Sequence, residues 1–199
     1  MKTYLILILI LSIGFSGCQE RNNQPKPKGF LALNYQPAEY KNFRSDCPFS
    51  FQLNKAIKKQ QVKQNSCDYT ITYPDKKANI YLTYRPIKDN LQNLLIDAQK
   101  IPTKHQIKAD AISVEVFENQ TRRVFGNFYK VKGNAASQAQ FYVTDSINHF
   151  LTASLYFDAK PNYDSVYPAS QYIIRDMKEM METMKWKRVA QDSLSFVSE

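Results

Sequence analysis

Two runs of alternating residues within residues 133–165 constrain the fold of this chain most strongly. In the first run, Ala139, Phe141 and Val143 alternate with Gln138, Gln140, Tyr142 and Thr144. In the second run, Leu151, Ala153, Leu155 and Phe157 alternate with Phe150, Thr152, Ser154 and Tyr156. A period of two puts each set on one face of a β-strand. The residues between the runs, Asp145 to Asn148, suit a tight turn. The stretch therefore predicts a long antiparallel hairpin with an apolar face that other segments must cover.

Two further pairs of strands are predicted around this hairpin. Residues 67–73 and 78–84 alternate and are joined by the turn-forming run Pro74 to Lys77. Residues 111–117 alternate as well and are expected to pair with residues 124–131. Residues 55–64, KAIKKQQVKQ, are mostly polar, and their pattern is compatible with either a strand or a short helix.

The apolar spacing also predicts two main helices. Residues 90–104 carry a stripe of the helical period, with Asp89 or Asn90 as the N-cap; the stripe is Leu91, Leu94, Leu95, Ala98 and Ile101. A second helix is expected after Asp164 as its cap, with Pro168 in its first turn. Its stripe is Val166, Ala169, Ile173, Met177, Met180 and Met184, and the methionines are expected to fill core rather than to line a binding groove.

The order of elements, strands then helix then strands then helix, indicates an α+β fold with a central antiparallel sheet. This order is similar to the α-β-α sandwich of Mog1/PsbP-like domains. The globular domain is expected to span residues 30–187, and the polar residues 188–199 to form a flexible tail.

The N-terminal 17 residues are typical of an export signal rather than of the folded domain. Lys2 precedes an apolar run of ten residues, Tyr4 to Ile13, which is too short to span a bilayer because a span needs roughly 20 residues. Small residues then lead directly to Cys18, as in a bacterial lipobox, so Cys18 is the expected lipidation site, with acyl chains such as palmitate. The alternative is an ordinary signal peptide followed by an incidental cysteine.

Residues 18–29 are polar and rich in proline, which predicts an extended tether between the anchor and the domain. Glu20 is the only acidic residue near the new terminus, and the absence of an acidic cluster favours the periplasmic side over the cell surface. We therefore expect a lipid-anchored protein of the cell envelope, at the outer membrane and facing the periplasm.

The chain has a net charge of +9, and removal of residues 1–17 takes away Lys2 and no acid, which leaves +8. Such a charge favours anionic partners, although a solvated basic surface is the simpler interpretation. The densest cluster is Lys55, Lys58, Lys59 and Lys63, and it lacks the interleaved aromatic residues on which single-stranded nucleic acids stack. The export signal likewise argues against a nucleic-acid partner.

The three cysteines divide into one anchor and one pair. If Cys18 is lipidated, Cys47 and Cys67 remain in an oxidising compartment, where a disulfide between them is expected; the alternative is two separate buried thiols. The sequence holds no CxxC motif, so redox catalysis and zinc binding lack their signature.

No motif for catalysis, a metal or a cofactor is recognisable. His105 follows the first predicted helix, where a cation suits the helix C-terminus, and His149 follows a turn and is expected to be exposed. The residues around Ser137 do not match the G-x-S-x-G pattern of a nucleophile elbow. We therefore expect a protein that is not an enzyme and needs no cofactor.

The run Gly133 to Ser137 is open to two interpretations. Small residues with Gly-Asn permit a positive φ and a close approach of another backbone, as in a tightly packed connection between strands. The same features would suit a docking surface for another protein, for which the candidate residues are His105, Gly133, Asn134, Ser137 and Gln138.

Four stretches of the chain carry a resemblance to a known family: residues 46–49, residues 105–112, the run GNAASQAQF and the run 159–165. Together they resemble the GldD family of gliding-motility lipoproteins, over nearly the whole chain from Lys26 to Trp186. The resemblance implies an envelope lipoprotein required for gliding, tied to type IX protein secretion and acting through contacts with other envelope proteins of that machinery. It brings no catalytic residues. The alternative is a periplasmic enzyme or a binding module for an envelope polymer such as peptidoglycan.

Overall fold

A computed structural model describes residues 35–104, 109–158 and 162–187, and for residues 101–104 it describes the backbone alone. The predicted signal peptide, tether and tail therefore lie outside the described residues. So do Cys18 and His105.

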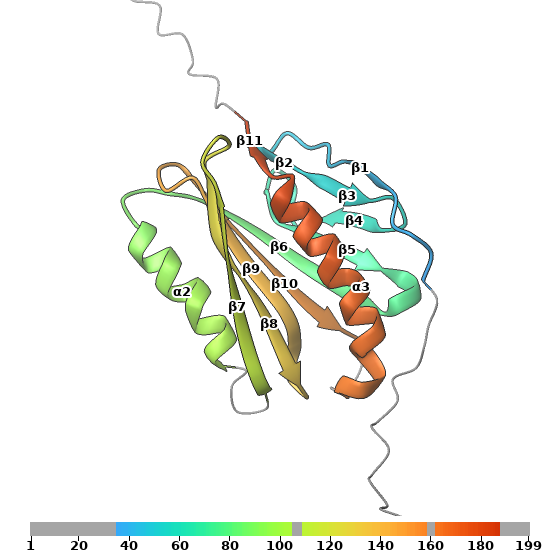
Figure 1. The fold of residues 1–199 in the computed structure, drawn as a ribbon. Coiled ribbons are helices and arrows are strands. Elements are labelled where there is room, and N and C mark those ends of the chain that lie inside the picture. Colours follow the sequence, from blue (N-terminus) through green and yellow to red (C-terminus); the bar gives the residue numbers. More distant parts are fainter. Residues whose placement is uncertain (1–34, 105–108, 159–161, 188–199) are drawn as a thin grey trace, which may run out of the picture.

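A seven-stranded antiparallel sheet forms the centre of the molecule, in the order β4-β5-β6-β10-β9-β8-β7 (Figure 1). Its strands are β4 (Lys58–Gln61), β5 (Tyr69–Tyr73), β6 (Ala78–Pro86), β7 (Ala109–Asn119), β8 (Val124–Gly133), β9 (Ser137–Thr144) and β10 (His149–Phe157). The hairpin predicted from the alternating runs is β9–β10, which pairs Phe150 with Thr144 and Leu151 with Val143. This hairpin lies in the middle of the sheet because β8 and β6 pair with its two outer edges.

One face of the sheet is covered by α3 (Tyr163–Glu182) and by two small sheets. These pair β1 (Tyr40–Asn42) with β3 (Gln52–Asn54), and β2 (Phe49–Ser50) with β11 (Lys185–Trp186). The main core lies here, between Phe141 and Leu155 of the sheet and the methionine stripe of α3. Met177, Met180 and Met184 are fully buried, which confirms that they fill the core.

The opposite face carries α2 (Leu91–Lys104), as Figure 1 shows. Its residues Leu91, Leu94, Leu95 and Ala98 pack on a second cluster made by Tyr129, Tyr142 and Phe150. With a helix on each side of an antiparallel sheet, the predicted α+β class is confirmed, while the likeness to Mog1/PsbP-like domains stays a prediction.

The structure settles the conformation of residues 58–61 and corrects the predicted start of the second helix. Residues 58–61 form strand β4 at the edge of the sheet, where all four side chains are exposed, which explains why no alternation was visible. Helix α3 begins at Tyr163, so Asp164 lies in its first turn rather than capping it, and Pro168 lies further inside the helix than expected.

Candidate interaction surfaces

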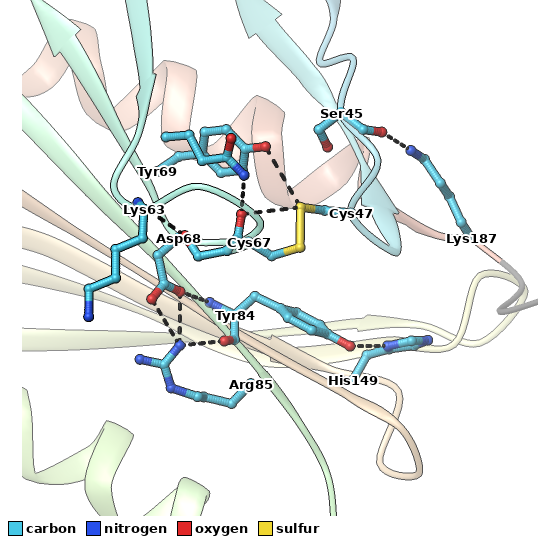
Figure 2. The surroundings of a disulfide bond; sticks show 12 residues. Ser45, Cys47, Lys63, Cys67, Asp68, Tyr69, Tyr84, Arg85, His149 and Lys187 are labelled. Carbon is cyan, nitrogen blue, oxygen red and sulfur yellow. Dashed lines mark hydrogen bonds and ion pairs between the residues drawn. A yellow bond between two sulfur atoms is a disulfide. The ribbon is translucent and has the colours of Figure 1, made fainter.

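A disulfide joins Cys47 to Cys67, with their Cα atoms 5.6 Å apart (Figure 2). Cys47 is buried just before β2, and Cys67 precedes β5. The bond therefore ties the small sheets to the main sheet near its β4 edge. Beside it, the Asp68 carboxylate accepts hydrogen bonds from the backbone N–H of Tyr84 at 3.0 Å and from the Arg85 guanidinium at 2.8 Å.

His149 is buried, with 5% of its surface exposed, so the expectation of an exposed histidine is wrong. It begins strand β10, and its Nδ1 lies 2.8 Å from the hydroxyl of Tyr84 (Figure 2). Its ring stacks on Trp186 with the centroids 5.1 Å apart. Burial lowers the pKa of His149, and the nearby Asp145 carboxylate opposes this shift only in part. The neutral imidazole is thus the favoured form in this corner of the molecule.

Asp145 fixes the turn of the central hairpin. Burial alone would raise the pKa of Asp145, but its Oδ1 accepts three backbone N–H groups, from Ile147, His149 and Asn148, and their combined effect lowers the pKa. Asp145 is therefore explained by the fold, as the acceptor that closes the turn.

The run Gly133 to Gln138 is a packed connection between β8 and β9, which is the first of its two interpretations. Gly133 has φ 109°, and a Cβ on it would lie 2.7 Å from the backbone N of Asp110. Gly133, Ser137 and Gln138 are buried, so the predicted docking surface is wrong for these three residues. Asn134 is exposed, yet its Oδ1 is occupied, because it accepts the backbone N–H of Tyr163 at 2.8 Å.

Gln138 also faces a cavity of about 320 Å³ between β7, β8 and the first half of α3. Its Nε2 donates to the carbonyls of Gly133 and Ala135, which fixes the orientation of the amide. Its Oε1 is buried and has no hydrogen-bond partner in the part of the chain that the structure describes. The cavity walls are mostly apolar, with polar groups from Ser113, Lys132, Tyr163, Tyr167 and Gln171.

A cationic groove of about 450 Å³ lies at the other end of α3, and we define it by Arg44, Arg122 and Lys185. Its remaining lining is Asn42, Ser50, Phe51, Gln52 and Thr183, so no carboxylate from the described part of the chain lines it. None of the three cations forms an ion pair within the described ranges. Arg122 is positioned by a hydrogen bond of 2.8 Å from its guanidinium to the backbone carbonyl of Glu182.

More positive charge surrounds this groove. Lys59 donates to the carbonyl of Arg44, and Lys187 donates to the carbonyl of Ser45. Burial lowers the pKa of Lys59, and the nearby cation Lys41 lowers it further. The arrangement concentrates cations at one end of the molecule, where an anionic group would neutralise them.

Sequence patterns could not place this groove, because its residues come from four separate segments of the chain. A further group that was missed is Asp176, which is buried on α3 and accepts hydrogen bonds from Tyr40, Asn54 and Tyr73. One signal was available: Asp176 follows Ile173 by three residues and precedes Met180 by four, so it falls on the apolar stripe of its helix.

Within residues 35–104, 109–158 and 162–187, no three His, Cys, Asp or Glu side chains are grouped so as to hold a metal ion. No helix in the described part of the chain has the length and apolar character needed to cross a membrane.

The fold and these surfaces define an α+β protein with one disulfide, a buried polar corner and a cationic groove. A family model described as gliding motility lipoprotein GldD matches residues 20–186, and the chain belongs to this family. The predicted resemblance is thereby confirmed. Family membership makes the chain a gliding-motility lipoprotein of the cell envelope. A search of curated proteins found no match to this chain.

Proposed function

We propose that this protein is a lipid-anchored, non-catalytic component of the gliding machinery at the outer membrane, facing the periplasm, and that it acts by binding other envelope proteins. A link to type IX protein secretion is part of the proposal. Support comes from membership of the gliding-motility lipoprotein family and from the export signal with its lipobox cysteine, Cys18.

The cationic groove is the observation that carries the proposed mode of action. Three cations without carboxylate partners among the described residues line a hollow whose other polar side chains are Asn42, Ser50, Gln52 and Thr183. Arginine suits this task because its planar guanidinium can hold a carboxylate through two parallel hydrogen bonds. The groove therefore fits an acidic segment of a partner protein, with Asp or Glu side chains that would enter it.

The test is a reversal of charge in the groove, with Arg122→Glu and Lys185→Glu introduced together into the full chain. We expect the protein to be made, lipidated and located as usual, whereas gliding of single cells and co-purification of crosslinked envelope proteins are reduced at least tenfold. A matched control reverses Lys58 and Lys63, two exposed lysines outside the groove, and should leave both readouts unchanged. Equal losses of gliding and of co-purified proteins in the groove variant and the control variant would contradict the proposed mode of action. Normal gliding in the groove variant would contradict it as well.

The anchor has its own test. Cys18→Ala is expected to leave the protein unlipidated and away from the membrane fraction, and to abolish gliding, because stable anchoring requires the acyl chains. Full motility from the unlipidated protein would contradict this part of the proposal.

A second candidate function is supported by the cavity at Gln138. Hydroxyl groups and apolar walls suit a ligand that combines hydrogen-bonding groups with an apolar group, such as the acetamido sugars or stem peptides of peptidoglycan. Titration of the isotope-labelled protein with a soluble muropeptide tests this, since binding should shift the amide resonances of Gln138 and Ser113. A saturable shift favours a binding module for the envelope polymer, and unchanged spectra at millimolar ligand exclude it.

A further inference from the structure

Strand β7 is a long edge of the central sheet. It has 11 residues, and among the described residues it hydrogen-bonds to a strand, β8, on one side only. The opposite edge, β4, is different: it has four residues, KKQQ, all of them exposed. Short, lysine-rich edges resist pairing with another chain, whereas a long edge without lysine or proline invites it. The sequence of β7, ADAISVEVFEN, contains neither residue.

One face of β7 is apolar and uncovered. Val114 is 51% exposed and Val116 is 72% exposed, and both lie on the same face as Ile112. Helix α2 packs on Tyr129 and Tyr142 of β8 and β9, and so leaves the two valines open.

The charge on β7 is already neutralised from within the chain. Glu115 forms ion pairs with Lys130 of β8 and Lys178 of α3. Hydrogen bonds from these two lysines lower the pKa of Glu115, so the carboxylate is ionised and paired at neutral pH. An incoming strand therefore meets no unpaired glutamate at the centre of β7.

We propose that β7 pairs in antiparallel fashion with β7 of a second copy of this chain, with Val114 opposite Val114. In this register Ile112 faces Val116, and Ser113 faces Glu115, so the apolar residues of both copies form one continuous stripe. The ladder would run from Ala111 to Phe117 and stop at the irregularity in pairing around Asp110.

The neighbouring symmetric registers are less favourable. A centre at Glu115 would place two carboxylates directly opposite each other, which is destabilising in a β-ladder. A centre at Ser113 would place Val116 opposite Asp110. Of these three registers, only the proposed one pairs all of Ile112, Val114 and Val116 with apolar residues, and it would unite the seven strands of each copy in a single sheet.

This inference is independent of the proposed function and has a direct test in the full chain within its own envelope. Opposed residues of an antiparallel pair have Cα atoms about 4.5–5.5 Å apart, within the range that a disulfide bridges. Val114→Cys should therefore give, under mild oxidation, a covalent species of twice the monomer mass that disappears on reduction. The matched control is Ser113→Cys, whose side chain would face Glu115, and it should give at least tenfold less of this species.

Three outcomes would overturn the inference: no covalent dimer from Val114→Cys, equal dimer from both variants, or a crosslink to a protein of different mass. A second measurement covers the case in which the cysteine disturbs folding. The full-length protein in detergent should sediment as a dimer, and Val116→Lys should sediment as a monomer with an unchanged near-ultraviolet circular dichroism spectrum. A parent protein that is monomeric at every concentration would contradict the proposed pairing.

Discussion

Asn134 Oδ1 accepts a hydrogen bond from the backbone N–H of Tyr163 at 2.8 Å, so a loop residue caps a helix that begins 29 residues later. Asn162, directly before the helix, forms no side-chain cap of its own. The contact fastens the start of α3 to the connection between β8 and β9.

Replacement of Asn134 by alanine should therefore lower the free energy of unfolding by about 1 kcal/mol, the usual contribution of an N-cap. Urea denaturation followed by circular dichroism measures this change. Asn134→Asp keeps an acceptor oxygen at the same place and should retain most of the stability. If Asn134→Ala and Asn134→Asp are equally destabilised, loss of the cap does not explain the lower free energy of unfolding.

Asp176 holds α3 to the strands beneath it. Its carboxylate accepts hydrogen bonds from Tyr40 at 2.8 Å, Asn54 at 2.8 Å and Tyr73 at 2.9 Å, and the side chain is buried. Asp176→Asn replaces one acceptor oxygen by a donor, so at least one buried donor loses its partner, at a cost of about 1–3 kcal/mol. Denaturant unfolding should show this loss, whereas Glu182→Gln, exposed on the same helix, should change stability by less than about 0.5 kcal/mol. A similar loss of stability in Asp176→Asn and Glu182→Gln would contradict the stabilising role of the hydrogen bonds to Asp176.

The Cys47–Cys67 bond can be detected directly. Mass spectrometry of a digest made without reductant should find the two cysteine peptides crosslinked. Replacement of both cysteines by serine should lower the free energy of unfolding by roughly 3 kcal/mol, the amount that the chain-entropy argument gives for a loop of this length. Complete alkylation of both residues without reduction would show that they are free thiols.

His149 should make stability depend on pH. Its folded-state pKa lies below the usual 6.5, chiefly because the ring is buried. The unfolded chain therefore takes up a proton first, and stability should be full above about pH 6.5 and fall as the pH is lowered below it. His149→Gln should flatten the dependence of stability on pH below about pH 6.5. If the free energy of unfolding depends on pH in the same way in the parent protein and in His149→Gln, His149 is not the group responsible.

Local patterns predicted the regular elements well, because apolar periodicity survives in the sequence wherever one face of an element is buried. The short strands β1, β2, β3 and β11 have only two or three residues each, too few to show a period. The cap by Asn134, the network at Asp176 and the cationic groove all join residues far apart in the chain. Those contacts depend on how the layers pack, which a periodic pattern does not specify.

We propose that this chain is an envelope component of gliding and that it is linked to type IX secretion. A clean in-frame deletion, complemented with the intact chain, tests it when single-cell gliding and secretion of a type IX cargo are scored in the same cells. We expect both to be lost in the deletion and restored by complementation. Normal gliding in the deletion strain would contradict the claim, and loss of gliding with normal secretion would contradict the proposed link to type IX secretion.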